Sequence, residues 1–104
     1  MAHTGYFTLE QNVVKTVSRL LTNVSNSTGF EHMTNIIKLL EYINEQPHFA
    51  RHRILNQTVI LKIREILQLC YNPNSSPNPS DKHYAIHLCN TYLRKIGTYG
   101  MNKL

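Results

Sequence analysis

The stretch TGFEHMTNIIKLLEYI, residues 28–43, decides the fold class of this chain. Thr28 and Glu31 have the spacing of a capping box, in which two side chains satisfy backbone N–H groups at the start of a helix. The apolar residues that follow recur at the spacing of one helix face: Met33, Ile36, Ile37, Leu40 and Ile43. Because this period is helical and not strand-like, we predict a helix that Pro47 ends.

Toward the N-terminus, another capping box begins at Thr8 and predicts the start of a second long helix. The apolar face of this helix is expected to hold Leu9, Val13, Val17, Leu20 and Val24. The segment 25–29 then breaks the helix, because its short polar side chains compete for backbone hydrogen bonds.

Toward the C-terminus, Pro47 suits the first turn of a short helix. The apolar residues expected on this short helix are Phe49, Ala50, Ile54 and Leu55. The segment Asn56–Thr58 predicts the cap of the next long helix, whose apolar residues extend from Val59 to Cys70.

The segment 72–80 is rich in proline, asparagine and serine, and it predicts an exposed loop. Ser80 and Asp81 are expected to cap a last long helix, which Gly97 closes. The apolar face of this helix is expected to hold Tyr84, Ala85, Leu88, Tyr92 and Ile96.

No segment alternates apolar and polar residues with the period of a strand, so the predicted fold class is all-α. The expected architecture is a compact bundle of five helices, four long and one short. No segment repeats another at a fixed period, which argues against an open repeat array. We interpret residues 1–104 as a single interaction domain, excised from a larger protein.

The charge and the hydropathy of the chain limit the classes of function that it can have. Eleven Lys and Arg against six Asp and Glu give a net charge of +5, yet charged residues are only 16% of the chain. The surface is therefore expected to be polar and moderately basic. The longest aliphatic run, Val59–Leu61, is far too short to span a membrane, so no membrane partner is expected. Cys70 and Cys89 could form a disulfide, but two buried thiols in an intracellular domain are the favoured interpretation.

Residues suited to catalysis or metal binding are few. Asp81 is the only Asp, and the glycines lie at the ends of predicted elements instead of in a phosphate-binding loop. His83 and His87 share a helix face, and His48 and His52 repeat their spacing, but zinc needs about four converging ligands. We therefore predict a protein that is not an enzyme, with no catalytic residues, metal, cofactor or small-molecule substrate.

Basic residues offer an alternative function, which is nucleic-acid binding. The candidate residues are Arg51, Arg53, Lys62 and Arg64. Nucleic-acid modules usually concentrate such charge on one face, with aromatic residues between the basic ones. Here the charges are scattered among helices, so a moderately basic solvated surface is the favoured interpretation.

Three stretches carry a resemblance to a known family: IIKLLEYI (36–43), ILNQTVI (54–60) and AIHLCNTYLRKI (85–96). They resemble the second helix, the junction after it and the last helix of the TFIIS N-terminal domain. This family of helical bundles also includes the integrase-binding domain of LEDGF. The chain departs from the family at Tyr92, where Trp is typical, and in the missing Gly after Val59. The resemblance implies a non-enzymatic protein–protein interaction module in transcription elongation or chromatin regulation, in the nucleus.

The resemblance also implies where a partner binds. Family members engage ligands through two loops, which correspond here to 25–30 and 71–80. The partner-binding residues expected in and beside these loops are Asn26, Phe30, Tyr71 and Asn74. The expected partners are intrinsically disordered peptide segments of other nuclear proteins, which aromatic side chains at helix ends can anchor. In the alternative interpretation, Phe30 plugs the end of the bundle and Tyr71 only packs at a helix terminus.

Overall fold

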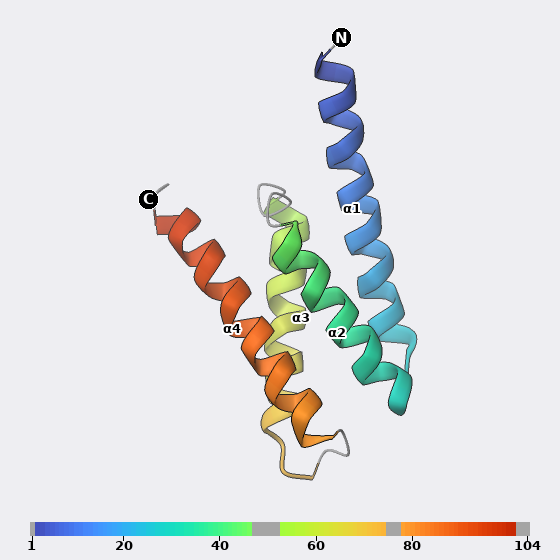
Figure 1. Cartoon of the computed structure of the whole chain (residues 1–104), viewed down its shortest axis with the longest axis vertical. Coiled ribbons are helices and arrows are strands. Elements are labelled where there is room, and N and C mark those ends of the chain that lie inside the picture. The colour runs from blue at the N-terminus through green and yellow to red at the C-terminus, as the bar shows by residue number, and fades with distance from the viewer. Residues whose placement is uncertain (1, 47–52, 75–77, 102–104) are drawn as a thin grey trace.

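The computed structural model describes residues 2–46, 53–74 and 78–101, and the side chains of 11–46, 53–74 and 78–96 among them. These residues form four helices and no strand: α1 (Ala2–Asn26), α2 (Phe30–Glu45), α3 (Arg53–Tyr71) and α4 (Pro79–Met101) (Figure 1). The all-α prediction is confirmed, whereas the number of helices in the described part of the chain is four and not five.

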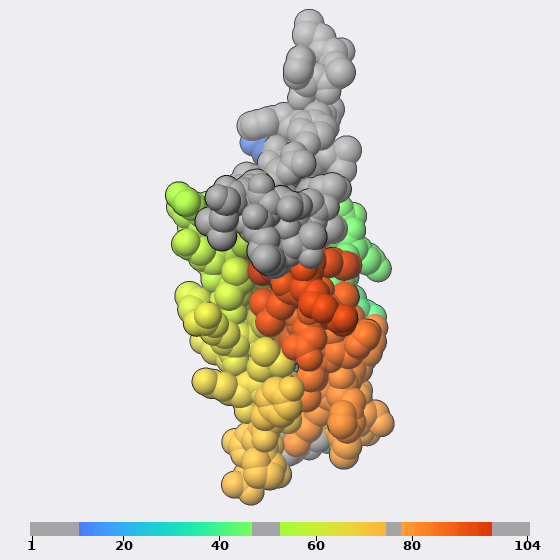
Figure 2. Space-filling model, turned by 90° about the vertical axis from the view of Figure 1, so that its left-hand side faces the viewer, coloured from blue at the N-terminus to red at the C-terminus, as the bar shows by residue number. Residues whose placement is uncertain are grey.

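The helices form two hairpins that share one core. α1 and α3 run in one direction, and α2 and α4 run in the opposite direction (Figure 1). α2 lies between α1 and α4 and packs against both. α3 packs along α4, as Figure 2 shows. By contrast, α1 and α3 touch only sparsely. The N-terminal part of α1 extends past the other helices, and the molecule measures 52 × 29 × 20 Å.

All four helices contribute buried apolar side chains to the core, as the predicted helix faces require. The fully buried ones with the largest volumes are Tyr92, Ile36, Leu39, Leu40, Ile43, Ile63, Val17, Val24 and Val59. Tyr84 departs from its predicted face, because 41% of it is exposed and its hydroxyl donates to Glu41 Oε2 at 2.8 Å. The prediction of the faces was therefore right for most positions and wrong for this tyrosine.

The structure differs from the prediction in the second half of the expected short helix. Ile54 and Leu55 belong to the first turn of α3, which runs without a break through the segment 56–58. Asn56 and Thr58 do not cap a helix, because both side chains bond elsewhere. Asn56 Oδ1 accepts from the Tyr92 hydroxyl at 2.7 Å, and the Thr58 hydroxyl donates to the Ile54 carbonyl at 3.1 Å. Residues 47–52, including Pro47, Phe49 and Ala50, lie outside the described residues.

Two predicted helix ends are also corrected. α1 begins at Ala2 and runs through Thr8, so that residue lies inside the helix. A capping box favours a start but does not impose one, and most residues before Thr8 are compatible with a helix. α4 continues past Gly97 to Met101. A glycine ends a helix when it adopts a left-handed conformation, and among the described residues only Gly29 has a positive φ.

The N-terminus of α4 is capped two positions before Ser80, the first of the two predicted cap residues. Asn78 Oδ1 accepts the backbone N–H of Ser80 at 2.8 Å, and the Asn78 carbonyl accepts from the backbone N–H of Lys82. Pro79 is the first helical residue, where its missing N–H and fixed φ are harmless. Asn78 is thus the cap, and Ser80 lies inside the helix that it was expected to cap.

The turn between α1 and α2 depends on Gly29. Gly29 is the N-cap of α2, and its φ of 64° and ψ of −138° are not helical. No side chain forms a hydrogen bond at this cap. The predicted capping box of Thr28 and Glu31 is therefore wrong, since Thr28 lies one residue before the cap. The backbone conformation of Gly29 is close to a region that only glycine adopts readily.

Gly29→Ala is expected to destabilise the fold by about 1 to 3 kcal/mol. The cause is backbone strain and not a clash, because a Cβ added there meets no atom within 4 Å. The free energy of unfolding, measured in urea, checks this expectation. Thr28→Ala is the matched control and should change it by less than about 0.5 kcal/mol. If Thr28→Ala lowered the free energy of unfolding more than Gly29→Ala does, the result would support the predicted capping box instead.

Polar contacts tie α2, α3 and α4 together at the end of the core far from this turn. The Tyr92 hydroxyl on α4 donates to Asn56 Oδ1 on α3 at 2.7 Å. Asn44 Nδ2 on α2 donates to the Leu88 carbonyl on α4 at 3.1 Å, and Lys95 Nζ donates to the Asn44 carbonyl at 2.8 Å. Burial also raises the pKa of Tyr92 well above its usual value, so its hydroxyl stays a donor.

Tyr92→Phe should lower the free energy of unfolding by about 1 kcal/mol, because it removes a hydrogen bond without leaving a cavity. Tyr92→Ala should lower it by about 3 to 5 kcal/mol, because it empties a core position. Tyr71→Phe serves as the control at an exposed tyrosine and should have almost no effect. Equal stability of the parent and Tyr92→Phe in urea would show that the hydroxyl contributes nothing.

Candidate partner-binding site

The four residues predicted to bind a partner lie at one end of the bundle, the end that holds the α1–α2 and α3–α4 connections (Figure 1). Asn26 ends α1, Phe30 begins α2 and Tyr71 ends α3. Asn74 follows in the connection to α4, where its backbone N–H donates to Asn72 Oδ1 at 2.9 Å. All four side chains are exposed. Their exposure makes them accessible to a partner.

Phe30 does not plug the bundle, because 98% of the residue is exposed. Tyr71 is 66% exposed and likewise contributes little to the core. Of the two interpretations of these aromatic residues, the structure therefore excludes burial of Phe30 in the end of the bundle. Exposed aromatic side chains at helix ends can contact another molecule through the faces of their rings.

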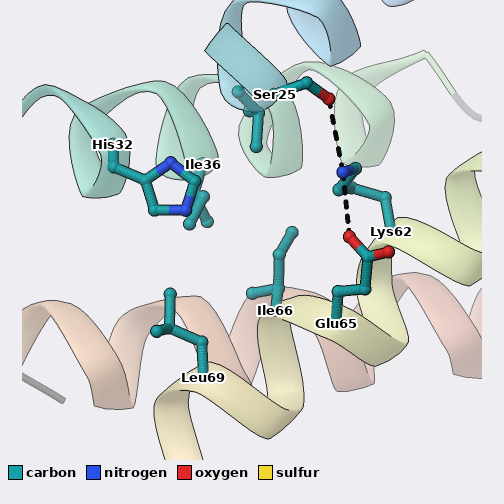
Figure 3. Close-up of a pocket in the computed structure, with 8 residues that line it drawn as sticks. Ser25, His32, Ile36, Lys62, Glu65, Ile66 and Leu69 are labelled. Atoms are coloured by element: carbon teal, nitrogen blue, oxygen red, sulfur yellow. Dashed lines mark hydrogen bonds and ion pairs between the residues drawn. The ribbon is translucent and has the colours of Figure 1, made fainter. Parts of the chain in front are cut away.

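A groove that the sequence did not predict opens at the same end, between α1, α2 and α3. Its volume is about 280 Å³. The lining residues are Val24, Ser25, His32, Ile36, Lys62, Glu65, Ile66 and Leu69 (Figure 3). The groove exists because α1 and α3 touch only sparsely, so the space between them is not filled by side chains.

The floor of the groove is apolar and its rim is polar. Ile36 and Ile66 belong to the buried core, and Leu69 lies beside them (Figure 3). At the rim, Lys62 Nζ donates to Glu65 Oε2 at 2.9 Å and to Ser25 Oγ at 3.4 Å. An apolar floor with a few polar groups around it is the usual composition of a binding site.

A hydrogen-bond chain fixes the ring of His32 at the other side of the groove. The Ser27 hydroxyl donates to the Val24 carbonyl at 3.0 Å, and Ser27 Oγ lies 3.1 Å from His32 Nδ1. A protonated Nδ1 donates to Ser27 Oγ, whose own proton goes to the carbonyl. The chain holds the first turn of α2 against the end of α1.

The basic residues proposed for nucleic-acid binding do not share one face. Arg53 and Arg64 are exposed and eleven residues apart, about three helical turns, so they lie on one flank of α3. Lys62 is about 200° around the helix from Arg64 and faces α1, where its Nζ donates to Ser25 Oγ. Lys62 also pairs with Glu65 of its own helix. Arg51 lies outside the described residues. Three of the four candidates are thus divided between opposite flanks.

Charge is nevertheless distributed unevenly between the helices. Among the described side chains, α1 and α3 carry five Lys and Arg against one acidic residue, whereas α2 and α4 carry four of each. The groove lies between the two basic helices and α2. An anionic partner is therefore attracted to this half of the molecule more strongly than to the other half.

The two cysteines are buried and unpaired, on α3 and α4 respectively. Burial raises the pKa of the Cys89 thiol to about 12, and it also raises that of Cys70, which Lys82 partly opposes. Thiols in this state are poor nucleophiles. Within the described part of the chain, no three His, Cys, Asp or Glu residues converge as metal ligands. His83 and His87 are exposed there, and His48 and His52 lie outside it.

The thiols should make the fold sensitive to alkaline pH. Below about pH 9 the Cys89 thiol stays protonated in both the folded and the unfolded chain. Above about pH 9 the unfolded chain loses this proton before the folded chain does. The free energy of unfolding should therefore fall as the pH rises from about 9 toward 12, the pKa of Cys89 in the folded chain. Urea titrations under reducing conditions measure this fall. Cys89→Ala should make this fall less steep without abolishing it, because the pKa values of Cys70 and Tyr92 are raised as well; an unchanged slope would contradict the role of Cys89.

Comparison of the chain with protein-family models, with curated proteins and with solved structures found no match. None of the described helices combines the length and the hydropathy that crossing a membrane requires. The features that this chain offers a partner are exposed aromatic residues and a groove, both at the end of the bundle that holds the α1–α2 and α3–α4 connections.

Proposed function

We propose that this chain is a non-enzymatic protein–protein interaction module that binds short disordered segments of partner proteins. The observation that carries the proposal is the exposure of Phe30 and Tyr71 at one end of the bundle. The resemblance to the TFIIS N-terminal domain adds the setting, which is transcription elongation or chromatin regulation in the nucleus. In this proposal the chain is a member of that family and needs no cofactor.

An end with a few exposed anchors suits a disordered partner. Such a partner loses conformational entropy when it binds, so it must gain its affinity from a small number of well-placed contacts. Aromatic side chains such as Phe30 and Tyr71 have only two χ angles, so ordering them on binding costs little conformational entropy. Asn26 and Asn74 supply side-chain amides that can bond the extended backbone of a peptide.

Nucleic-acid binding is the alternative, and ionic strength separates the two functions. If several phosphates are contacted, affinity should fall by orders of magnitude between about 50 and 200 mM salt. A peptide anchored by apolar side chains should lose far less. The placement of Lys62 on one flank of α3 and of Arg53 and Arg64 on the other disfavours a single phosphate-binding face.

Phe30→Ala and Tyr71→Ala should each weaken peptide binding by about 1 to 2 kcal/mol, as truncation of an anchor does. The probe is a displayed library of disordered segments from nuclear proteins, from which binding peptides are selected and their affinities measured. Both variants should keep the helical content of the parent, because neither side chain is part of the core.

Ile54→Ala is the matched control, since Ile54 is 81% exposed at the opposite end of α3. It should leave peptide binding unchanged. The proposal fails if the library yields no peptide. It also fails if Phe30→Ala and Tyr71→Ala bind as the parent does while Arg53→Ala abolishes binding, in which case the basic flank of α3 is the site.

A further inference from the structure

We infer that His83 and His87 of α4 form half of a zinc site, which the same two histidines of a second copy of the chain complete. Zn²⁺ then joins two chains through the outer face of α4. The inference goes beyond the proposed function and does not rest on it, because contacts of Phe30 and Tyr71 with a peptide need no metal. The sequence prediction of no metal concerned a single chain, which lacks the four ligands that zinc needs.

The two histidines have the spacing and the freedom that zinc ligands need. They are four residues apart on α4, so their side chains are neighbours on one face of the helix. Two histidines at this spacing bind zinc in the HExxH helix of metalloproteases. His83 and His87 are both exposed. Within the described part of the chain neither ring has a hydrogen-bond or ion-pair partner, in contrast to His32, whose Nδ1 lies 3.1 Å from Ser27 Oγ.

The site is incomplete in a single chain. A structural zinc ion takes four ligands in a tetrahedral arrangement, and no group of three His, Cys, Asp or Glu among the described residues could hold a metal. The first half of α4 lies open at the surface beside α3, and no described helix covers it (Figure 2). A second α4 can therefore approach this face and supply the two missing imidazoles. Such a contact is symmetric, with the metal on the two-fold axis.

The residues on either side of the pair select an antiparallel arrangement of the two α4 helices. Ser80 and Asn90 are exposed on the same face, about one turn before His83 and one turn after His87. In the antiparallel arrangement Ser80 of each copy lies opposite Asn90 of the other, where a hydroxyl and an amide can form a hydrogen bond. The two copies of Arg94 are then about 27 Å apart along the helix axes. A parallel arrangement would place them opposite each other.

Charge opposes this contact less than the net charge of +5 suggests. The described side chains of α2 and α4 carry four Lys and Arg and four Asp and Glu, so this half of the molecule is neutral. Lys82 is about 100° around the helix from His83 and acts on Cys70 of α3. Arg94 is about 14 Å along the helix from the centre of the pair. Exposed charges at this distance are largely screened at physiological salt, where the Debye length is about 8 Å.

Analytical ultracentrifugation of the chain with and without Zn²⁺ tests the inference, in a reductant that does not bind the metal. We expect a monomer without the ion, and with it a dimer that holds one zinc ion per two chains. His83→Ala and His87→Ala should each raise the zinc concentration at half-dimerisation by at least about tenfold, because each removes two of the four ligands. Both variants should keep the helical content of the parent, since both residues are exposed.

The double variant His48→Ala/His52→Ala is the matched control. It removes a pair of histidines with the same spacing that lies outside the described residues. The zinc-dependent dimer should be unchanged in this variant.

A cross-link tests the antiparallel arrangement. Ser80→Cys chains mixed with Asn90→Cys chains should form a disulfide-linked dimer with oxidised glutathione when Zn²⁺ is present. Ser80→Cys chains alone should not, because the two copies of residue 80 are then about 15 Å apart along the helix axes. The natural thiols of Cys70 and Cys89 are buried and do not compete.

Several results would overturn the inference. Zinc bound without dimerisation would show an adventitious ion only, and a dimer that persists in His83→Ala would show a contact that needs no zinc. Loss of the dimer in the His48→Ala/His52→Ala control would place the ligands elsewhere. Cross-linking of Ser80→Cys chains alone would contradict the antiparallel arrangement. None of these results bears on peptides bound through Phe30 and Tyr71, so the proposed function is tested separately.

Discussion

The burial of α2 from two sides is the constraint on which the rest of the structure depends. Ile36, Leu39, Leu40 and Ile43 are each fully buried, and α2 packs against α1 on one flank and α4 on the other. Because these four positions form a wide stripe on the surface of α2, one neighbouring helix cannot cover all of them. α1 and α4 are therefore both required, and α3 completes the core by packing on α4.

The groove is a consequence of this order of packing. α1 is attached to the bundle chiefly through α2, while α3 is attached chiefly through α4, so the two helices are positioned by different neighbours. Nothing forces them into close contact, and the space between their C-terminal parts stays open above Ile36 and Ile66. The turn at Gly29 joins α1 to α2 at the end of the bundle where the groove lies.

The sequence predicted those features that depend on residues near one another along the chain. Apolar spacing identified the buried face of each long helix and hence the all-α class, and the loops placed Phe30 and Tyr71 at helix ends. Asn56 misled the prediction, because its side chain bonds Tyr92, which is 36 residues away and invisible to local patterns. The groove was missed for the same reason. The residues of α3 that line the groove, such as Lys62 and Leu69, are spaced as on one helix face. The gap between α3 and α1, however, depends on how the helices pack, which local spacing does not reveal.

The pairing of Lys62 with Glu65 explains how a half-buried ammonium can stand beside an apolar floor when no partner is bound. An ammonium partly removed from water loses solvation, and a carboxylate three residues away restores part of what is lost. Ser25 on α1 supplies a second polar partner for Lys62 Nζ at 3.4 Å. The ammonium thus links α3 to the end of α1 across a boundary where the two helices otherwise touch only sparsely.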